Sequence, residues 1–333
     1  MSLNNFFRLD PQTEKQLKKI PGPILVIGAG GFIGSNLFTS LLISRRDIFG
    51  LSRNPQKNSK FKILNSPKNK LIKCDINNIK DLKSTFSKIK PKTVFNLSAY
   101  GAYSTQEDPF KIYQTNFIST INIIEELKKY KFHCYIHAGS SSEYGDNSNR
   151  PKENSILTPN SNYAVSKAAV SNAIYYYGKY ENLPLYHFRL YAVYGPFEEN
   201  ERLIPTIIKF GEQKKYPPLV SPNITRDFIY TSDITRAFIL GALNIKKNNY
   251  GEAFNIGTGK KTSIRTLALL TKELYKIKDG PKFGLMDNRR WDHGKDWYAN
   301  PNKATQLLKF RAKINLKEGL KKTIEFNHLL NLE

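Results

Sequence analysis

The sequence contains only two cysteines, Cys74 and Cys134, among its 333 residues. Each falls in a predicted buried strand, and their spacing matches no metal motif, so we expect core thiols without redox or zinc chemistry. Long hydrophobic runs are also absent, because no apolar stretch approaches the roughly 20 residues that a membrane-spanning helix needs. Residues 1–19 carry too many charges for the apolar core of a signal peptide. We therefore expect a cytoplasmic protein without a membrane segment.

Acidic residues are scarce relative to basic ones. The 52 lysines and arginines exceed the 28 aspartates and glutamates, and the formal net charge is +24. Such a charge is compatible with a nucleic-acid partner or with an anionic substrate. The lysines are scattered along the whole chain, however, and form neither a basic helix face nor a ladder interleaved with aromatics. We therefore expect no nucleic-acid partner, and interpret the charge as a compositional bias that also attracts an anionic substrate.

The stretch that organises the chain is Ile24–Gly34, which reads ILVIGAGGFIG. Its four apolar residues predict a buried parallel strand, and a helical pattern begins near Phe32. The glycines allow a tight turn, close approach of a dinucleotide pyrophosphate, and packing of the helix on the strand. The pyrophosphate would lie on the free N–H groups of the helix start. The residues expected to hold it are Gly28, Gly31, Phe32, Ile33 and Gly34. The alternative is a glycine-rich turn that binds nothing.

Strands and helices alternate through the first half of the chain. The predicted strands after the first are Ile48–Ser52, Leu71–Cys74, Thr93–Leu97 and Tyr135–Ala138, and a long helix is predicted over Phe110–Tyr130. This alternation indicates an α/β protein with a Rossmann-type doubly wound parallel sheet. Ligands of such sheets bind beyond the carboxyl ends of the strands. Residues 1–22, with a short helix after Asp10-Pro11, are interpreted as a surface arm without chemistry.

Two predicted strand ends bear on the choice of cofactor. An acidic residue after the second strand would bind the adenosine ribose, whereas a basic residue would pair with a 2′-phosphate. Ser52 and Arg53 stand there, which favours NADP over NAD; a solvated loop arginine is the alternative. Asp75, followed by Ile76, either meets the adenine edge or caps the next helix. Leu97 and Ala99 lie in a stretch, Asn96–Ala99, that supplies small residues where the cofactor would pass.

Tyr163 and Lys167 stand four residues apart at the start of a predicted helix and so share one of its faces. A free phenol titrates near pH 10, and a neighbouring ammonium group shifts the phenol pKa towards the working range of a base. Ser140 ends the preceding strand and could hydrogen-bond the same substrate oxygen. A Tyr-x-x-x-Lys pair is common by chance, and it gains meaning here from the cofactor turn and the serine-rich strand end before it.

In this order the motifs resemble the extended short-chain dehydrogenase/reductase family, the NAD(P)-dependent nucleotide-sugar epimerases, dehydratases and 4-keto-sugar reductases. The resemblance covers about Pro23 to Phe326. The matching pieces are Gly28–Gly34, Asp75, Asn96–Ala99, Asn116, Ser140–Gly145, Tyr163–Lys167, Arg189–Pro196, Arg202–Pro205, Arg226–Tyr230 and Phe254–Gly259.

The resemblance implies a role for each matching side chain. Tyr163 would be the general acid/base, Lys167 would hold the nicotinamide ribose and lower the tyrosine pKa, and Ser140 would bind the reacting carbonyl. Asn116 would organise the proton path from within its helix. Arginines would clamp the diphosphate of a nucleotide sugar, because guanidinium forks bind phosphate oxygens in pairs. The residues expected to contact this substrate are Ser141, Glu143, Arg226, Arg289 and Arg290.

Several residues distinguish the reactions that this family catalyses. Family 4,6-dehydratases carry an acidic pair between the catalytic Ser/Thr and the following Tyr-Gly, whereas Ser141–Glu143 holds one acid, which disfavours a dehydratase. A 4-keto-6-deoxy-sugar reductase using NADPH fits Ser52-Arg53 and is the preferred interpretation. A 4-epimerase with tightly held NAD is the alternative. A non-catalytic NAD(P)-binding or RNA-associated protein is disfavoured by the intact catalytic residues.

The resemblance also implies two lobes and a homodimer. The cofactor domain would comprise residues 23–188 and 227–258, and the nucleotide-sugar lobe residues 189–226 and 259–333. The dimer would form through the helices around Asn116 and Ala168. Trp291, His293 and Trp297 either line a sugar or base pocket or pack at the lobe edge, and no metal is expected.

Overall fold

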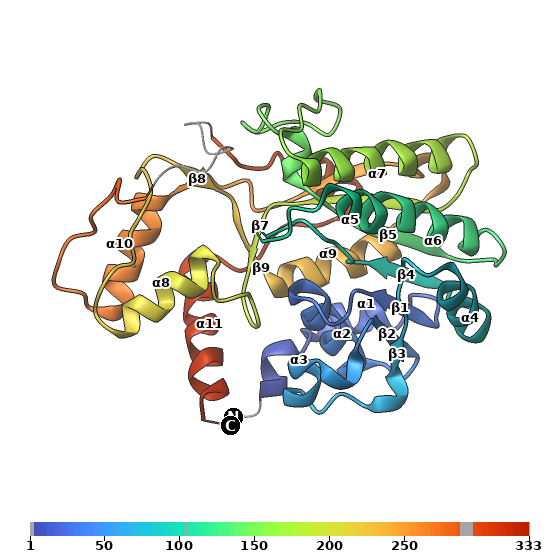
Figure 1. Cartoon of the computed structure of the whole chain (residues 1–333), viewed down its shortest axis with the longest axis horizontal. Coiled ribbons are helices and arrows are strands. Elements are labelled where there is room, and N and C mark those ends of the chain that lie inside the picture. Colours follow the sequence, from blue (N-terminus) through green and yellow to red (C-terminus); the bar gives the residue numbers. More distant parts are fainter. Residues whose placement is uncertain (1–2, 104, 287–295, 333) are drawn as a thin grey trace.

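The computed structural model describes residues 3–103, 105–286 and 296–332. Across these residues, the centre of the molecule is a parallel seven-stranded sheet with the order β10-β6-β5-β4-β1-β2-β3 (Figure 1). Its strands are β1 (Ile24–Ile27), β2 (Ile48–Ser52), β3 (Leu71–Lys73), β4 (Thr93–Asn96), β5 (Cys134–Ser140), β6 (Leu185–Leu190) and β10 (Ala253–Ile256). The predicted Rossmann-type doubly wound sheet is therefore confirmed.

Helices cover both faces of this sheet. The helices are α1 (Pro11–Leu17), α2 (Phe32–Ser44), α3 (Ser59–Ile63), α4 (Ile79–Ile89), α5 (Pro109–Tyr113), α6 (Ser119–Leu127), α7 (Asn162–Lys179), α8 (Leu203–Glu212), α9 (Thr231–Leu243), α10 (Ile264–Tyr275) and α11 (Leu316–Leu330). Successive residues of a strand point to opposite faces, so β1 contributes to two cores. Ile24 and Val26 pack with α1, α2 and α9, whereas Leu25 and Ile27 pack with α4, α6 and α7.

Short helical turns complete the chain. The 3₁₀ turns are η1 (Leu3–Phe7), η2 (Pro55–Lys57), η3 (Lys68–Lys70), η5 (Ser141–Tyr144) and η6 (Lys247–Asn249), and the π-helical turns are η4 (Gln114–Ile118) and η7 (Ala304–Leu308). The predicted helix over Phe110–Tyr130 is thus α5, η4 and α6 in succession. A π turn inserts one extra residue per turn and is frequent at functional sites. Here it contains Asn116.

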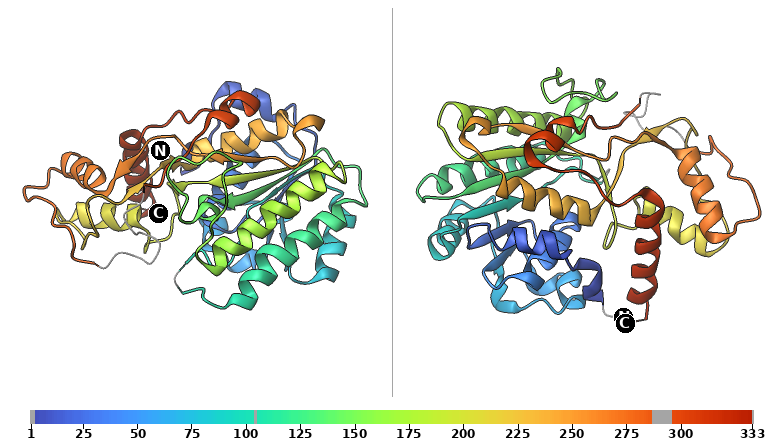
Figure 2. Two further views of the ribbon diagram at one scale, coloured as in Figure 1. Left: turned by 90° about the horizontal axis from the view of Figure 1, so that it is seen from above. Right: turned by 180° about the vertical axis from the view of Figure 1, so that it is seen from behind.

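A smaller lobe lies beside the sheet (Figure 2). It contains α8, α10 and α11, whose apolar side chains form a separate core around Ile207, Leu267 and Leu320. Two short strand pairs join it to the sheet domain: β7 (Ala192–Tyr194) with β9 (Phe228–Tyr230), and β8 (Thr225–Arg226) with β11 (Thr262–Ser263). The residue boundaries of the two lobes and the homodimer stay predictions.

The interpretation of the N-terminal segment as a surface arm is wrong. Leu3, Phe7, Leu17 and Ile20 are buried. Leu17 and Ile20 join the core beneath α2 and α9, while Leu3 and Phe7 pack near α11. The segment looked polar because its apolar residues are few, yet these four face the protein.

Both cysteines are free and buried, as predicted. Burial raises the pKa of each thiol, so neither is a ready nucleophile. Across the described ranges, no helix has the length and apolar character needed to cross a membrane.

Candidate active site

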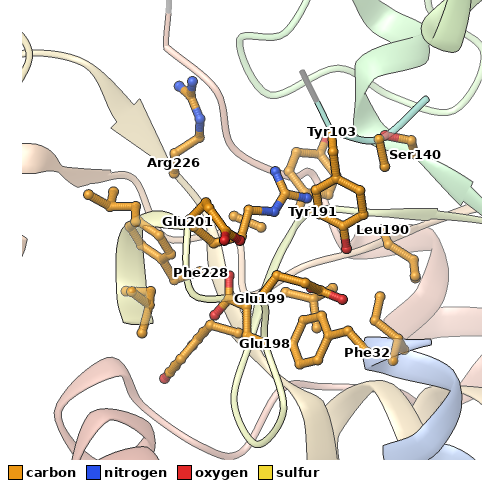
Figure 3. Close-up of a pocket in the computed structure, with 18 of the residues that line it drawn as sticks. Phe32, Tyr103, Ser140, Leu190, Tyr191, Glu198, Glu199, Glu201, Arg226 and Phe228 are labelled. Atoms are coloured by element: carbon orange, nitrogen blue, oxygen red, sulfur yellow. The ribbon is translucent and has the colours of Figure 1, made fainter. Parts of the chain in front are cut away.

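A cavity of about 550 Å³ opens at the carboxyl ends of β1, β4 and β5 and continues into the smaller lobe. One end is formed by Gly31–Gly34, and the other by residues around Arg226 and Phe228. Figure 3 shows Ser140, Tyr103 and Tyr191 on one side of this space, Arg226 and Phe228 on the other, and three glutamates between them. The cavity therefore links the glycine-rich turn to the lobe in which a second ligand was predicted.

The turn between β1 and α2 has the geometry of a dinucleotide site. Gly28 adopts a φ of +79°, and a Cβ there would lie 2.8 Å from the Leu97 carbonyl carbon. A Cβ on Gly34 would overlap the Gly28 carbonyl oxygen, so only glycine allows the helix to pack this closely. Within the described parts of the chain, no side chain caps the start of α2 at Gly31. The first N–H groups of α2 are thus free to bind an anion, and Phe32 and Ile33 line the cavity beside them. These residues fit the pyrophosphate of NAD or NADP.

The other predicted cofactor residues divide into two groups. Leu97 and Ala99 line the cavity, as do Gly31–Gly34, whereas Ser52, Arg53, Asp75 and Ile76 lie at the ends of β2 and β3 and do not line it. Ser52 Oγ is nevertheless near the turn, 3.1 Å from the position of a Cβ on Gly30. Arg53 is exposed.

Asp75 does not cap the following helix. Its Oδ1 accepts a hydrogen bond from the Asn77 N–H at 3.0 Å, which closes a local turn. The cap of α4 is Asn78, whose Oδ1 accepts from the Lys80 and Asp81 N–H groups. The capping alternative for Asp75 is therefore wrong, and a contact with the adenine edge stays a prediction.

Ser140, Tyr163 and Lys167 converge on the cavity from β5 and α7. Lys167 is almost completely buried, and its Nζ donates to the Ala138 carbonyl oxygen at 2.8 Å. The same Nζ lies 3.4 Å from Nε2 of His137 and 5.8 Å from the centre of the Tyr163 ring. A lysine ammonium has three N–H donors, and β5 takes two of them. Strand and helix together therefore fix the position of the ammonium beside the tyrosine.

Burial shifts the pKa values of both Tyr163 and Lys167. Burial raises the pKa of Tyr163 to about 12, while the charge of Arg202 and the hydroxyl of Ser140 act in the opposite direction. Burial also lowers the pKa of Lys167 to about 8, which the negative charge of Glu143 partly opposes. The desolvation of the phenol therefore outweighs the charge of Arg202 and the hydroxyl of Ser140, and the predicted lowering of the tyrosine pKa by Lys167 stays a prediction.

Asn116 is buried behind the catalytic residues and does not line the cavity. Its Oδ1 accepts from the Tyr100 N–H at 2.8 Å, and its Nδ2 donates to the Tyr100 carbonyl oxygen and to Ser166 Oγ, both at 2.9 Å. Ser166 lies between Tyr163 and Lys167 on α7. The side chain of Asn116 therefore joins the loop after β4 to the helix that carries the catalytic pair, and its predicted role in a proton path stays a prediction.

Glu143 does not line the cavity, and its predicted contact with substrate stays a prediction. It is completely buried, and its carboxylate binds His187 Nε2 at 2.7 Å and Arg189 Nε at 2.8 Å. It also accepts from the Ser140 N–H at 2.8 Å. The reason is that Ser140 caps the start of η5 and Glu143 completes a capping box with it, which directs the carboxylate back to the Ser140 N–H. Glu143 thus supports the backbone of Ser140 instead of facing the cavity.

Ser141 likewise does not line the cavity, and its predicted contact with substrate stays a prediction. It is buried, and its hydroxyl accepts from the indole N–H of Trp297 at 3.0 Å. The Trp297 ring in turn lies 5.3 Å from the guanidinium of Arg226, which does line the cavity. Trp297 therefore packs between the serine-rich turn and Arg226. Arg289, Arg290, Trp291 and His293 lie outside the described residues.

Sequence reasoning missed part of the cavity wall. Glu198, Glu199, Glu201 and Arg202 line it, and the Arg202 guanidinium lies 5.2 Å from the Tyr103 ring. Burial raises the pKa of Glu198 to about 8. Oε2 of Glu198 and of Glu199 is buried and has no hydrogen-bond partner among the described residues. The Arg202–Pro205 motif matches the family and could have indicated this segment, but it was assigned no role from the sequence.

Comparisons with known proteins agree with this geometry. The profile of the NAD dependent epimerase/dehydratase family matches residues 24–257. A putative UDP-glucose 4-epimerase of Methanocaldococcus jannaschii is 29% identical over 310 residues, which cover 91% of this chain and 97% of that protein. The human dTDP-D-glucose 4,6-dehydratase is 28% identical over 328 residues, covering 91% of this chain and 89% of that protein.

A solved structure gives the same result. UDP-glucuronic acid 4-epimerase from Bacillus cereus, in complex with UDP-glucuronic acid and NAD, is 27% identical with a TM-score of 0.79. The match covers 92% of this chain and 99% of that one. The dinucleotide in that complex is NAD, and the comparisons do not support the predicted preference for NADP. The expected membership is confirmed: the chain is an enzyme of the extended short-chain dehydrogenase/reductase type and belongs to the NAD dependent epimerase/dehydratase family.

Proposed function

We propose that this protein is a nucleotide-sugar 4-epimerase that keeps NAD bound through its catalytic cycle. The observation that carries the proposal is the convergence of Ser140, Tyr163 and Lys167 on the same cavity as the glycine-rich turn. Relatives named as 4-epimerases support this alternative over the preferred keto-sugar reductase. Arg53, on which the reductase interpretation partly depended, is an exposed residue outside the cavity wall.

In this proposal, Tyr163 removes the proton of the sugar 4-hydroxyl and later returns it. Ser140 donates a hydrogen bond to the same oxygen and orients it towards the phenol. NAD held at the glycine-rich turn Gly31–Gly34 would supply the hydride acceptor for carbon 4 and the donor for its return to the opposite face of the keto sugar. Lys167, held by β5, places a positive charge where the nicotinamide ribose and the phenolate are predicted. Arg226 binds the diphosphate at the far end of the cavity.

The position of Glu143 argues against a 4,6-dehydratase. Dehydration needs a further acid/base near the reacting carbons. The one acid in the stretch after Ser140 is Glu143, and its carboxylate is occupied by Arg189, His187 and the Ser140 N–H. A carboxylate held in this way cannot reach the cavity.

The cavity wall favours a sugar without a carboxylate. Burial raises the pKa of Glu198 to about 8 and so leaves it largely protonated at pH 7, but the carboxylates of Glu199 and Glu201 still outnumber the single cation of their segment, Arg202. A uronic acid would bring another negative charge beside them, and like charges repel most strongly where water is excluded. We therefore expect a neutral or amino sugar to be preferred over a glucuronate.

The first experiment is to denature the purified protein and identify the released dinucleotide. NAD at about one equivalent per chain, together with interconversion of UDP-glucose and UDP-galactose without added cofactor, is the expected result. Consumption of NADPH by a 4-keto-6-deoxy nucleotide sugar, with no bound NAD, would contradict the proposal and restore the reductase. Comparison of UDP-glucose with UDP-glucuronic acid then tests the sugar preference, and equal or greater turnover of the glucuronate would contradict it.

A further inference from the structure

The acidic segment of the cavity wall follows a phenylalanine that is packed by residues from two distant parts of the chain. The ring of Phe197 is stacked 6.1 Å from that of Phe7 in η1 and lies edge-on, 4.9 Å from that of Phe326 in α11. Phe7 and Phe326 are themselves in contact at 6.0 Å, and both are buried. The rings of Phe7, Phe197 and Phe326 are therefore in mutual contact, directly before the segment Glu198–Arg202 in the chain.

Phe197 needs this support because of its backbone conformation. Its φ is +64°, in the left-handed region that L residues with a Cβ disfavour. A bulky residue holds such a conformation only when surrounding contacts stabilise it. The packing of Phe7 and Phe326 on the Phe197 ring provides these contacts.

The residues on either side of Phe197 are tied to the cofactor half of the molecule. Nδ2 of Asn36, in α2, donates to the Pro196 carbonyl oxygen at 2.8 Å in a buried contact. Nζ of Lys60 lies 3.9 Å from a carboxylate oxygen of Glu199. The segment thus runs from an anchor on α2, through the aromatic cluster, to the wall of the cavity.

The anchoring parts lie outside the residues that the family profile matches. The family profile covers residues 24–257, so η1 and α11 lie outside it. Their apolar side chains, with those of Ile63, Leu64 and Phe197, form a core cluster of their own. The chain therefore uses its two outer elements to pack the segment that carries Glu198, Glu199, Glu201 and Arg202.

We propose that Phe7 and Phe326 are positioning residues, which hold Phe197 and thereby set the segment Glu198–Arg202 in the geometry that binds the nucleotide sugar. The expected effect on kinetics rests on the proposed function. The ring packing is observed independently of that function. Loss of the Phe7 ring frees Phe197 to leave the left-handed conformation, and the cavity wall shifts with it. Although η1 also packs on α2, the glycine-rich turn and α7 contribute no described side chain to this aromatic cluster, so we expect the dinucleotide and the catalytic pair to stay in place.

The test compares three variants of the full chain. Phe7→Ala removes the stacked ring, and Phe7→Leu keeps apolar volume but not the stacking. Phe6→Ala is the matched control, because Phe6 packs edge-on against Phe326 at 5.4 Å and has no ring contact with Phe197 in the described chain. We expect Phe7→Ala to raise the KM for UDP-glucose about 10- to 100-fold, since misplacements near 1 Å cost this much, with bound NAD unchanged. Phe7→Leu should be intermediate, and Phe6→Ala close to wild type.

Amide hydrogen exchange gives a readout that does not depend on the reaction. Residues 197–203 should exchange faster in Phe7→Ala than in wild type or Phe6→Ala, while exchange in β5 and α7 stays the same. If wild type does not epimerise UDP-glucose, the proposed function fails, yet the exchange result still tests the positioning role. Unchanged exchange of residues 197–203 in a folded Phe7 variant would overturn the proposal. An unfolded Phe7→Ala leaves the decision to Phe7→Leu by the same measurement.

Discussion

Replacing Glu143 with glutamine tests whether this residue supports the fold or acts on substrate. The carboxylate is completely buried and contacts His187, Arg189 and the Ser140 N–H at 2.7 to 2.8 Å. Glutamine keeps the shape but removes the charge, which leaves the buried Arg189 guanidinium without its counter-ion. Breaking a buried ion pair in this way costs about 3–5 kcal/mol of unfolding free energy.

The expected shift of the melting temperature follows from the size of the chain. At about 2.1 cal/mol/K per residue, the 333 residues have an unfolding entropy of about 0.7 kcal/mol/K. A loss of about 3–5 kcal/mol therefore lowers the melting temperature by about 4–7 °C, as measured by calorimetry at one scan rate. Other hydrogen bonds of Arg189, to Tyr144, Ser171 and the Glu153 carbonyl oxygen, keep the loss within this range.

Glu14→Gln is the matched control for this experiment. Glu14 pairs with Lys18 at 3.1 Å on the surface of α1, where the side chains of Lys18 and Glu14 are 61% and 38% exposed. Exposed pairs contribute about 0–1 kcal/mol, so this variant should melt within about 1 °C of wild type. The reasoning is refuted if Glu143→Gln melts like the control but loses activity more than about 100-fold, the size of effect expected for a general acid/base.

Three further predictions address the cavity itself. Tyr163→Phe should lower kcat about 100- to 10,000-fold while the protein keeps its bound NAD, and turnover within a few-fold of wild type would exclude Tyr163 as the acid/base. Lys167→Met should raise the melting temperature at pH 7. Burial lowers the pKa of Lys167 from 10.5 to about 8, so burying its charged ammonium destabilises the folded state, and methionine removes this cost. This gain should shrink as pH rises from 8 to 10.5, where the unfolded lysine also loses its proton, and a gain that grows over that range would contradict the assignment. Gly34→Ala should reduce both NAD content and melting temperature through its overlap with Gly28, whereas Gly280→Ala, with nothing within 4 Å of the new Cβ, should change neither.

Local patterns in the sequence carried the prediction of the sheet and of the catalytic pair. The strand Ile24–Ile27 and the glycines after it are fixed by near neighbours: a buried four-residue strand, a φ of +79° at Gly28, and a helix packed on the turn. Tyr163 and Lys167 share a helix face whatever lies around them, because their spacing is one turn. The order of these motifs along a doubly wound sheet then placed them at one edge.

The nature of each polar contact was decided by tertiary structure. Glu143 looked like a substrate contact from its motif, and it became a buried partner of Arg189 because β6 places that arginine beside it from 46 residues further along the chain. In the same way, nothing near Phe7 in the sequence indicates that it packs on Phe197.

The sequence by itself thus determined the elements, their order and the edge of the sheet where chemistry occurs. Only the tertiary structure decided which charges face the cavity, as Glu198 and Arg202 do, and which are buried in pairs, as Glu143 and Arg189 are. The physical reason is that periodicity reports the face of a residue on its own element, whereas burial and the pKa depend on partners that distant segments bring to it.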